Sequence, residues 1–149
     1  MSAMSDESPV FTIRRHLDAP PDRVFAAFID PPRLEQWFVV EGFRTPADRI
    51  RSDPKPGGGV EAVMVSDADG SEIPFGFRYR ELDPPNRVVL EFEDPREVVT
   101  VTLEAADGAA TNLTYSLAAL EAPSDLDAAR RGVEDMLDRI AAGIDQGLI

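Results

Sequence analysis

The sequence predicts an α+β domain in which an antiparallel sheet of six or seven strands curls around one long C-terminal helix. Two short helices are expected after the first strand. Apolar residues recur about every 3.6 positions in residues 21–38 and 126–144, but every second position between residues 59 and 118. Turn sequences such as Asp107-Gly108 separate the period-two segments. A helix and a sheet that are each apolar on one face must cover each other.

The chain is expected to begin with a disordered leader, residues 1–9, followed by a single domain over residues 10–149. Residues 10–18 alternate between apolar and polar side chains, which is typical of a strand with one buried face. The apolar face of this strand carries Phe11, Ile13 and Leu17, and it also includes Arg15.

Two short helices follow the first strand. Pro20-Pro21 suits a helix start, because the missing proline N–H has no partner in a first helical turn. Asp30-Pro31-Pro32 ends this helix and starts a second one over residues 33–38. The apolar residues at helical spacing are Val24, Phe25, Phe28 and Ile29 in the first helix, and Leu34, Trp37 and Phe38 in the second.

The middle of the chain is predicted to be a meander of short strands joined by tight turns. One weak strand is expected, over residues 47–53. The better strands are 59–66, 73–82, 87–93, 97–105 and 111–118, and the turn after the first of them is Asp67-Ala68-Asp69-Gly70. Their inward side chains are expected to include Phe75, Phe77, Tyr79, Val88, Leu90, Phe92, Val99, Val101, Leu103, Leu113, Tyr115 and Leu117.

The last segment is predicted to be the long helix. Ser124 can cap its start, with Asp127 three residues later in a position like that of a capping box. Its apolar stripe consists of Leu126, Ala129, Val133, Met136, Leu137, Ile140 and Ile144.

Charge and composition exclude several classes of function. The net charge is −13 and the chain has no cysteine and one histidine. Nucleic acids and anionic membranes are therefore disfavoured as partners, because both are bound through an excess of cations. Thiolate and multi-histidine metal sites are excluded, and no metal or cofactor is expected. A cytoplasmic location is expected, since no signal sequence or membrane-length apolar run is present. The chain is expected to be a monomer or a homodimer.

A set of short motifs gives the chain a family resemblance. They are Ala19-Pro20 with Val24-Phe25-Ala26-Ala27-Phe28, Asp30-Pro31, Leu34 with Trp37-Phe38, Pro56-Gly57-Gly58-Gly59, Asp69-Gly70, the stretch 79–87, the stretch 99–103 and the stretch 132–140. In this order, over about residues 10–146, they resemble the START-like helix-grip (SRPBCC) superfamily, and within it the AHSA type, named for the activator of the heat-shock protein 90 ATPase. This resemblance implies a cavity between the sheet and the last helix. The chain departs from the family pattern at Val133, where relatives often have tryptophan.

The expected ligand-binding residues are those that would line this cavity. Arg15 is included because an inward guanidinium needs a partner, either in the chain or on a ligand, unless it reaches water at the strand end. Buried tyrosine hydroxyls also need partners. The full set is Arg15, Trp37, Phe38, Met64, Phe75, Phe77, Tyr79, Tyr115, Val133, Met136, Leu137 and Ile140.

Three other patterns favour simple structural roles. His16, with Asp18 on the same strand face, is expected to be a solvent-facing residue rather than a catalytic base. Residues 67–72 are expected to form a hairpin turn rather than a calcium loop. Lys55-Pro56-Gly57-Gly58-Gly59 is expected to bend the sheet rather than bind phosphate, because no helix follows.

Three functions remain open at this point. The first is non-enzymatic binding of a small hydrophobic or aromatic molecule. The second, which some relatives imply, is a polyketide cyclase or aromatase, with Arg15, Tyr79 and Tyr115 as candidate groups. The third is a protein-partner role such as chaperone regulation, in which the acidic surface would meet a basic one.

Overall fold

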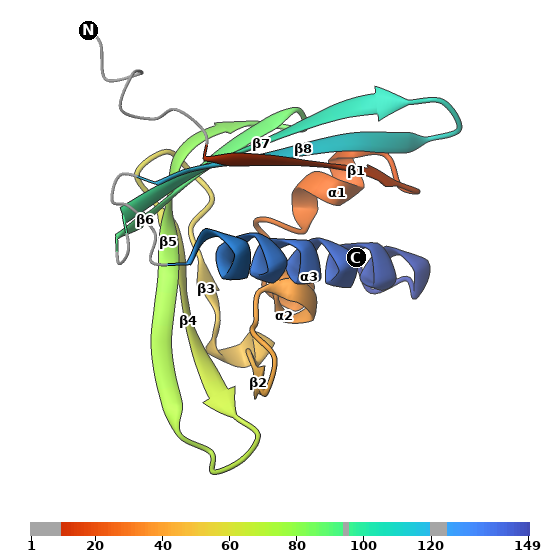
Figure 1. Ribbon diagram of the computed structural model, residues 1–149. Helices are drawn as coiled ribbons and strands as arrows, with labels where there is room; N and C mark the ends of the chain where they lie inside the picture. Colours follow the sequence, from red (N-terminus) through yellow and green to blue (C-terminus); the bar gives the residue numbers. More distant parts are fainter. Residues whose placement is uncertain (1–9, 94–95, 120–124) are drawn as a thin grey trace, which may run out of the picture.

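The computed structural model describes residues 10–93, 96–119 and 125–149. Figure 1 shows a curved sheet that wraps around one long helix. The strands are β1 (Phe11–Leu17), β2 (Phe43–Arg44), β3 (Arg51–Ser52), β4 (Gly59–Ser66), β5 (Glu72–Asp83), β6 (Arg87–Glu93), β7 (Arg96–Ala106) and β8 (Ala110–Ala119). The helices are α1 (Pro21–Ala26), α2 (Pro31–Trp37), the 3-10 turn η2 (Ala47–Arg49) and α3 (Leu126–Asp145). The predicted leader, residues 1–9, lies outside the described residues.

The strands form one antiparallel sheet in the order β1-β8-β7-β6-β5-β4-β2, with β3 also paired to β4. The predicted α+β architecture is therefore confirmed. The eight strands exceed the six or seven expected because β2, of two residues, is too short to show a sequence period. The predicted strand 47–53 is wrong over its first half, where Pro46 precedes the 3-10 turn η2 and only Arg51–Ser52 is extended.

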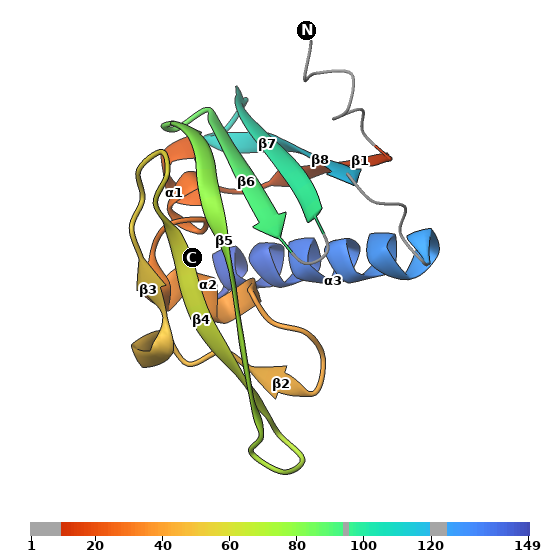
Figure 2. The same cartoon turned by 90° about the vertical axis from the view of Figure 1, so that its left-hand side faces the viewer.

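The β4–β5 hairpin projects from the rest of the sheet (Figure 2). The predicted turn at its tip is confirmed, since Val65 pairs with Glu72 and Gly70 adopts a positive φ of 75°. Further down the hairpin the two backbones come very close. A Cβ atom on Gly76 would lie 2.0 Å from the carbonyl oxygen of Val60, so only glycine fits there.

Helix α3 packs one face into the curve of the sheet. Its N-cap is Asp125, whose carboxylate accepts a hydrogen bond from the Ala128 N–H at 3.0 Å. The predicted cap Ser124 lies outside the described residues. Leu126 does not join the predicted stripe: it is 41% exposed because it lies in the first turn. The buried residues of α3 are Val133, Leu137, Ile140, Gly143 and Ile144.

The last residues of the described chain fold back onto α3. Ile149 is 2% exposed, and its side chain lies over Gly143, where a Cβ would come within 2.7 Å of it. Arg23 of α1 donates from Nε to the Ile149 carbonyl oxygen at 2.6 Å. The end of α3 is thereby joined to α1.

A single hydrophobic cluster links the inner face of the sheet, the short helices and α3. Its strand residues are those expected from the alternation, and its α3 residues are those of the predicted stripe. Among the described helices, none is long and apolar enough to cross a membrane.

Candidate functional site

Seven aromatic rings form a continuous series of contacts, here called the aromatic chain. It begins with Phe28, after α1, continues through the end of α2, passes to β5 and ends on β6. The contacts, given as centroid distances, are Phe28–Trp37 (5.1 Å), Trp37–Phe38 (5.5 Å), Phe38–Phe75 (4.5 Å), Phe38–Phe77 (5.2 Å), Phe77–Tyr79 (5.3 Å) and Phe77–Phe92 (5.6 Å). Their tilted and edge-on geometries are the favourable ones for aromatic pairs.

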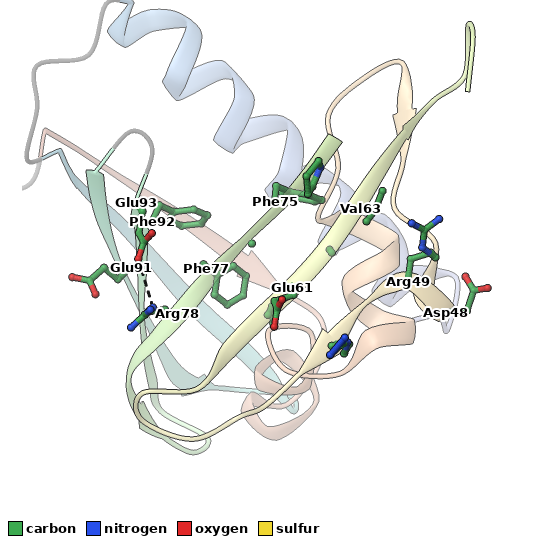
Figure 3. A pocket seen from close by; sticks show the side chains of 15 residues that line it. Asp48, Arg49, Glu61, Val63, Phe75, Phe77, Arg78, Glu91, Phe92 and Glu93 are labelled. Atoms are coloured by element: carbon green, nitrogen blue, oxygen red, sulfur yellow. Dashed lines mark ion pairs between the residues drawn. The ribbon is translucent and has the colours of Figure 1, made fainter. Parts of the chain in front are cut away.

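The open end of the aromatic chain lies in a hollow of about 930 Å³, here called the β5 hollow (Figure 3). It forms where the pairing between β5 and β6 ends: β5 pairs with β6 only from Arg78 onward, whereas it pairs with β4 from Glu72. The rings of Phe75, Phe77 and Phe92 contribute its aromatic wall. A second hollow of about 570 Å³ adjoins it along β3 and the glycine-rich turn before β4.

Charged side chains surround these rings. Arg49 donates two hydrogen bonds to Glu72, at 3.1 and 3.2 Å, and this pairing raises the pKa of Arg49 and lowers that of Glu72. Arg78 lies 3.6 Å from Glu93 across the gap between β5 and β6 (Figure 3). The hollow is therefore an aromatic patch inside a rim of mixed charge.

The structure brings some of the predicted ligand residues together at this site and places others elsewhere. Trp37, Phe38, Phe75, Phe77 and Tyr79 are all members of the aromatic chain. The residues outside it are Val133, Leu137 and Ile140, which are buried on α3; Met136, which is partly buried there; Tyr115, buried on β8; Met64, partly buried on β4; and Arg15 on β1. No residue of α3 lines either hollow, so both lie apart from the space between sheet and helix where a cavity was expected.

Both predicted tyrosines are buried, and burial determines how their hydroxyls ionise. Tyr79 is fully buried, and its hydroxyl donates a short hydrogen bond to the carbonyl oxygen of Phe28. Burial raises the pKa of Tyr79 to about 12. Burial and, secondarily, the charge of Glu97 also raise the pKa of Tyr115. Both phenols stay protonated at neutral pH, and the Tyr79 hydroxyl already serves the fold.

Arg15 has a partner within the chain. One of its terminal nitrogens lies 2.5 Å from a carboxylate oxygen of Asp138 on α3, and its side chain is 27% exposed. The alternation predicts that Arg15 points inward and needs a partner, and Asp138 on α3 is that partner. The guanidinium links two elements of the fold and lies away from the β5 hollow.

The structure shows where the three patterns assigned structural roles lie. His16 is exposed and its imidazole lies 3.6 Å from Asp18 and 3.0 Å from Asn112. Residues 67–70 form the hairpin turn, in which Asp69 accepts hydrogen bonds from Ser71. The glycines before β4 pack against the Asp53 backbone and β5. Across the described ranges, no group of acidic or histidine side chains is arranged to hold a metal ion.

Several residues at or near the site are absent from the predicted ligand set, the charged residues of its rim among them. Phe92 belongs to the predicted inner face but not to the predicted ligand set, and Phe28 is one of the apolar residues at helical spacing in the first predicted helix. Glu97 shares the inner face of β7 with Val99 and Val101, because alternate strand residues face the same side. Its odd position in an otherwise apolar alternation was the available signal.

Glu97 provides a test of that inner-face position. Burial raises its pKa, so the folded state binds the proton more tightly than the unfolded state does. The protonated Glu97 side chain therefore favours the folded state relative to the charged one. This contribution to the free energy of unfolding is complete below the unfolded-state pKa and is lost as the pH rises through the folded-state pKa. Glu97→Gln, which stays neutral, should raise the free energy of unfolding at pH 7 by less than about 1 kcal/mol, since Glu97 is only partly buried.

Urea denaturation at pH 4 and pH 7 measures this effect. The advantage of Glu97→Gln over the parent should shrink at pH 4. Glu104→Gln, at an exposed position on the same strand, is the control and should change stability little at either pH. A Glu97→Gln variant less stable than the parent at pH 7 would contradict the inner-face assignment.

The sheet curled around one long helix, with short helices closing one end, defines this chain as a helix-grip protein. A family model described as "Activator of Hsp90 ATPase homolog 1-like protein" matches residues 18–145, and the chain belongs to that family. The resemblance inferred from the motifs is therefore confirmed. A comparison with curated proteins gives no match.

Solved structures agree with this assignment. A crystal structure of a Chromobacterium violaceum protein is 31% identical, with a TM-score of 0.73, and the match covers 88% of this chain and 95% of that one. A Rhizobium leguminosarum protein is 28% identical, with a TM-score of 0.69 over 91% of this chain and 93% of its own. The solution structure of an AHSA1-like protein from Aeromonas hydrophila, 19% identical with a TM-score of 0.73 over 93% and 96%, shares the fold.

Proposed function

We propose that the chain binds a small aromatic or apolar molecule in the β5 hollow, without transforming it. The observation that carries this proposal is the pair of phenylalanines, Phe75 and Phe92, that are only partly buried at the open end of the aromatic chain. A ligand ring placed there would remove apolar surface from water, which contributes about 25 cal/mol per Å². The hollow's volume of about 930 Å³ falls within the range of ligand sites.

The character of the site supports binding more than chemistry. The one tyrosine of the aromatic chain has its hydroxyl bonded to the fold, and the arginines Arg49 and Arg78 are already paired with carboxylates. Of the other groups considered for a cyclase or aromatase, Arg15 pairs with Asp138 away from the hollow, and Tyr115 is buried on β8. The family description refers to an ATPase activator, a role that would depend on a protein partner rather than on these ring faces.

Titration with 2-naphthol, followed by backbone amide shifts of the labelled protein, tests the proposal. We expect shifts concentrated at Phe75, Phe77 and Phe92, and recovery of unchanged naphthol afterwards. Phe92→Leu should weaken binding at least about fivefold, because aromatic contacts contribute about 1 kcal/mol beyond area.

Phe43→Leu is the matched control, since Phe43 is a partly buried ring on β2 that does not line the hollow. Binding to this variant should be unchanged. Shifts spread over the whole surface, or equal weakening by both substitutions, would contradict a site at the β5 hollow.

A further inference from the structure

We propose that the free edge of β5, from Glu72 to Gly76, takes up an extended basic peptide of another protein as an additional strand. This proposal does not depend on the binding of a small molecule. It rests on the pairing of β5, on the direction of its backbone groups and on the charge around it.

Residues 72–76 of β5 are paired with β4 on one side and have no strand partner among the described residues on the other side. Strand β4 pairs with β5 from Glu72 to Arg78, whereas β6 pairs with it only from Arg78 onward. Figure 2 shows β5 continuing past the end of β6 toward the hairpin tip. Within the described part of the chain, no strand pairs with the other side of residues 72–77. Such an edge is a template for another strand.

The direction of the backbone groups follows from two hydrogen bonds. Tyr79 donates its N–H to the Gly58 carbonyl at 2.8 Å, and its carbonyl accepts from the Gly57 N–H at 2.9 Å, so the backbone of Tyr79 faces the β4 side. Backbone groups alternate in direction along a strand. The N–H and C=O of Glu72 and Gly76 therefore face the open side.

Pro74 lies between these two residues and also faces the open side. It offers a carbonyl oxygen but no N–H, and edge strands are where proline is tolerated in sheets. The open edge thus has donors at two alternate positions and acceptors at three. These donors and acceptors are enough to pair with a short added strand but not with a long one.

The side chains beside the edge define the class of partner. Inward side chains of an added strand would lie beside Phe75 and Phe92, which favours apolar residues. Outward side chains would lie on the same face as Glu91 and Glu93, whose carboxylates border the gap, and as Arg78, which lies 3.6 Å from Glu93 and leaves Glu91 without an arginine partner among the described residues of the gap (Figure 3). With a net charge of −13 on the whole chain, alternating basic and apolar residues are complementary to this edge. A second copy of this chain would instead bring its own charge of −13 to the same place.

A short peptide in which lysine alternates with valine or phenylalanine is the probe. Its dissociation constant is measured by calorimetry against a scrambled peptide of equal charge. Two further versions carry N-methyl groups, one on all lysines and the other on all apolar residues. Only one of these two sets can face β5, so one version should bind at least about tenfold more weakly and the other within about twofold.

Pro74→Thr supplies the missing N–H at an exposed position and should tighten binding about fivefold, which corresponds to one added hydrogen bond. Pro54→Thr, at another exposed proline outside both hollows, should leave binding unchanged. Equal binding of the scrambled peptide, equal effects of the two N-methyl sets, or self-association of the parent through this edge would overturn the proposal.

Discussion

Replacing Trp37 by alanine is expected to lower the free energy of unfolding by about 3–5 kcal/mol, as is found for buried aromatic residues that leave a cavity. The indole is 3% exposed and contacts the rings of Phe28 and Phe38. Its Nε1 donates to the Ala27 carbonyl at 2.7 Å, which holds α2 against the end of α1. The side chain therefore supports both short helices and the inner end of the aromatic chain.

Urea denaturation followed by far-ultraviolet circular dichroism measures this loss, since the variant has no tryptophan fluorescence. Trp37→Phe separates the two contributions. It keeps most of the ring contacts but leaves the Ala27 carbonyl without its donor, which costs about 1–3 kcal/mol. A loss below about 1 kcal/mol for Trp37→Ala would mean that the indole is not part of the core.

Gly76→Ala is the second large effect, and we expect it to destabilise the fold by about 2–3 kcal/mol. The added Cβ would lie 2.0 Å from the Val60 carbonyl oxygen, and this neighbour is backbone rather than a side chain that can turn aside. Relief of the clash must separate β4 from β5. Hydrogen exchange should therefore speed up first at the amides that pair these two strands.

Gly132→Ala is the matched control with the opposite sign. Gly132 lies inside α3, and a Cβ there meets nothing within 4 Å. Alanine is better than glycine in a helix interior by about 0.5–1 kcal/mol. This variant should raise stability, so equal destabilisation by both glycine replacements would contradict the close approach at Gly76.

The order of the elements could be predicted because most of them carry a clear period. The alternation at Phe75, Phe77 and Tyr79 identifies the inner face of β5, and the stripe from Val133 to Ile140 identifies that of α3. Strand β2 could not be predicted, since two residues have no period, and β3 is only the part Arg51–Ser52 of the strand predicted over residues 47–53. The N-cap of α3 is Asp125 rather than the predicted Ser124. Both residue types carry a side-chain oxygen that can accept a hydrogen bond from a backbone N–H, and here the Asp125 carboxylate accepts from Ala128.

The site was harder to predict than the fold. Sequence patterns indicate which side of a strand is inward, but not where a neighbouring strand ends. The β5 hollow exists because β6 pairs with β5 only as far as Glu91, while β5 extends further along β4. Likewise, nothing in the sequence indicates that Tyr79 bonds to Phe28, or that Arg15 meets Asp138. Those pairings join residues that are distant in the chain.

The position of β1 in the sheet has a consequence for how the chain folds. The first strand pairs with the last, β8, and the hydroxyl oxygens of Thr12 and Ser116 lie 3.1 Å apart across that pair. During synthesis β1 therefore has no sheet partner until residues 110–119 have been made. Such a closure gives a high contact order, which places folding in the millisecond-to-second class of β-rich domains rather than among microsecond helical bundles. Until then, the apolar face of Phe11, Ile13 and Leu17 depends on protection from outside the growing sheet.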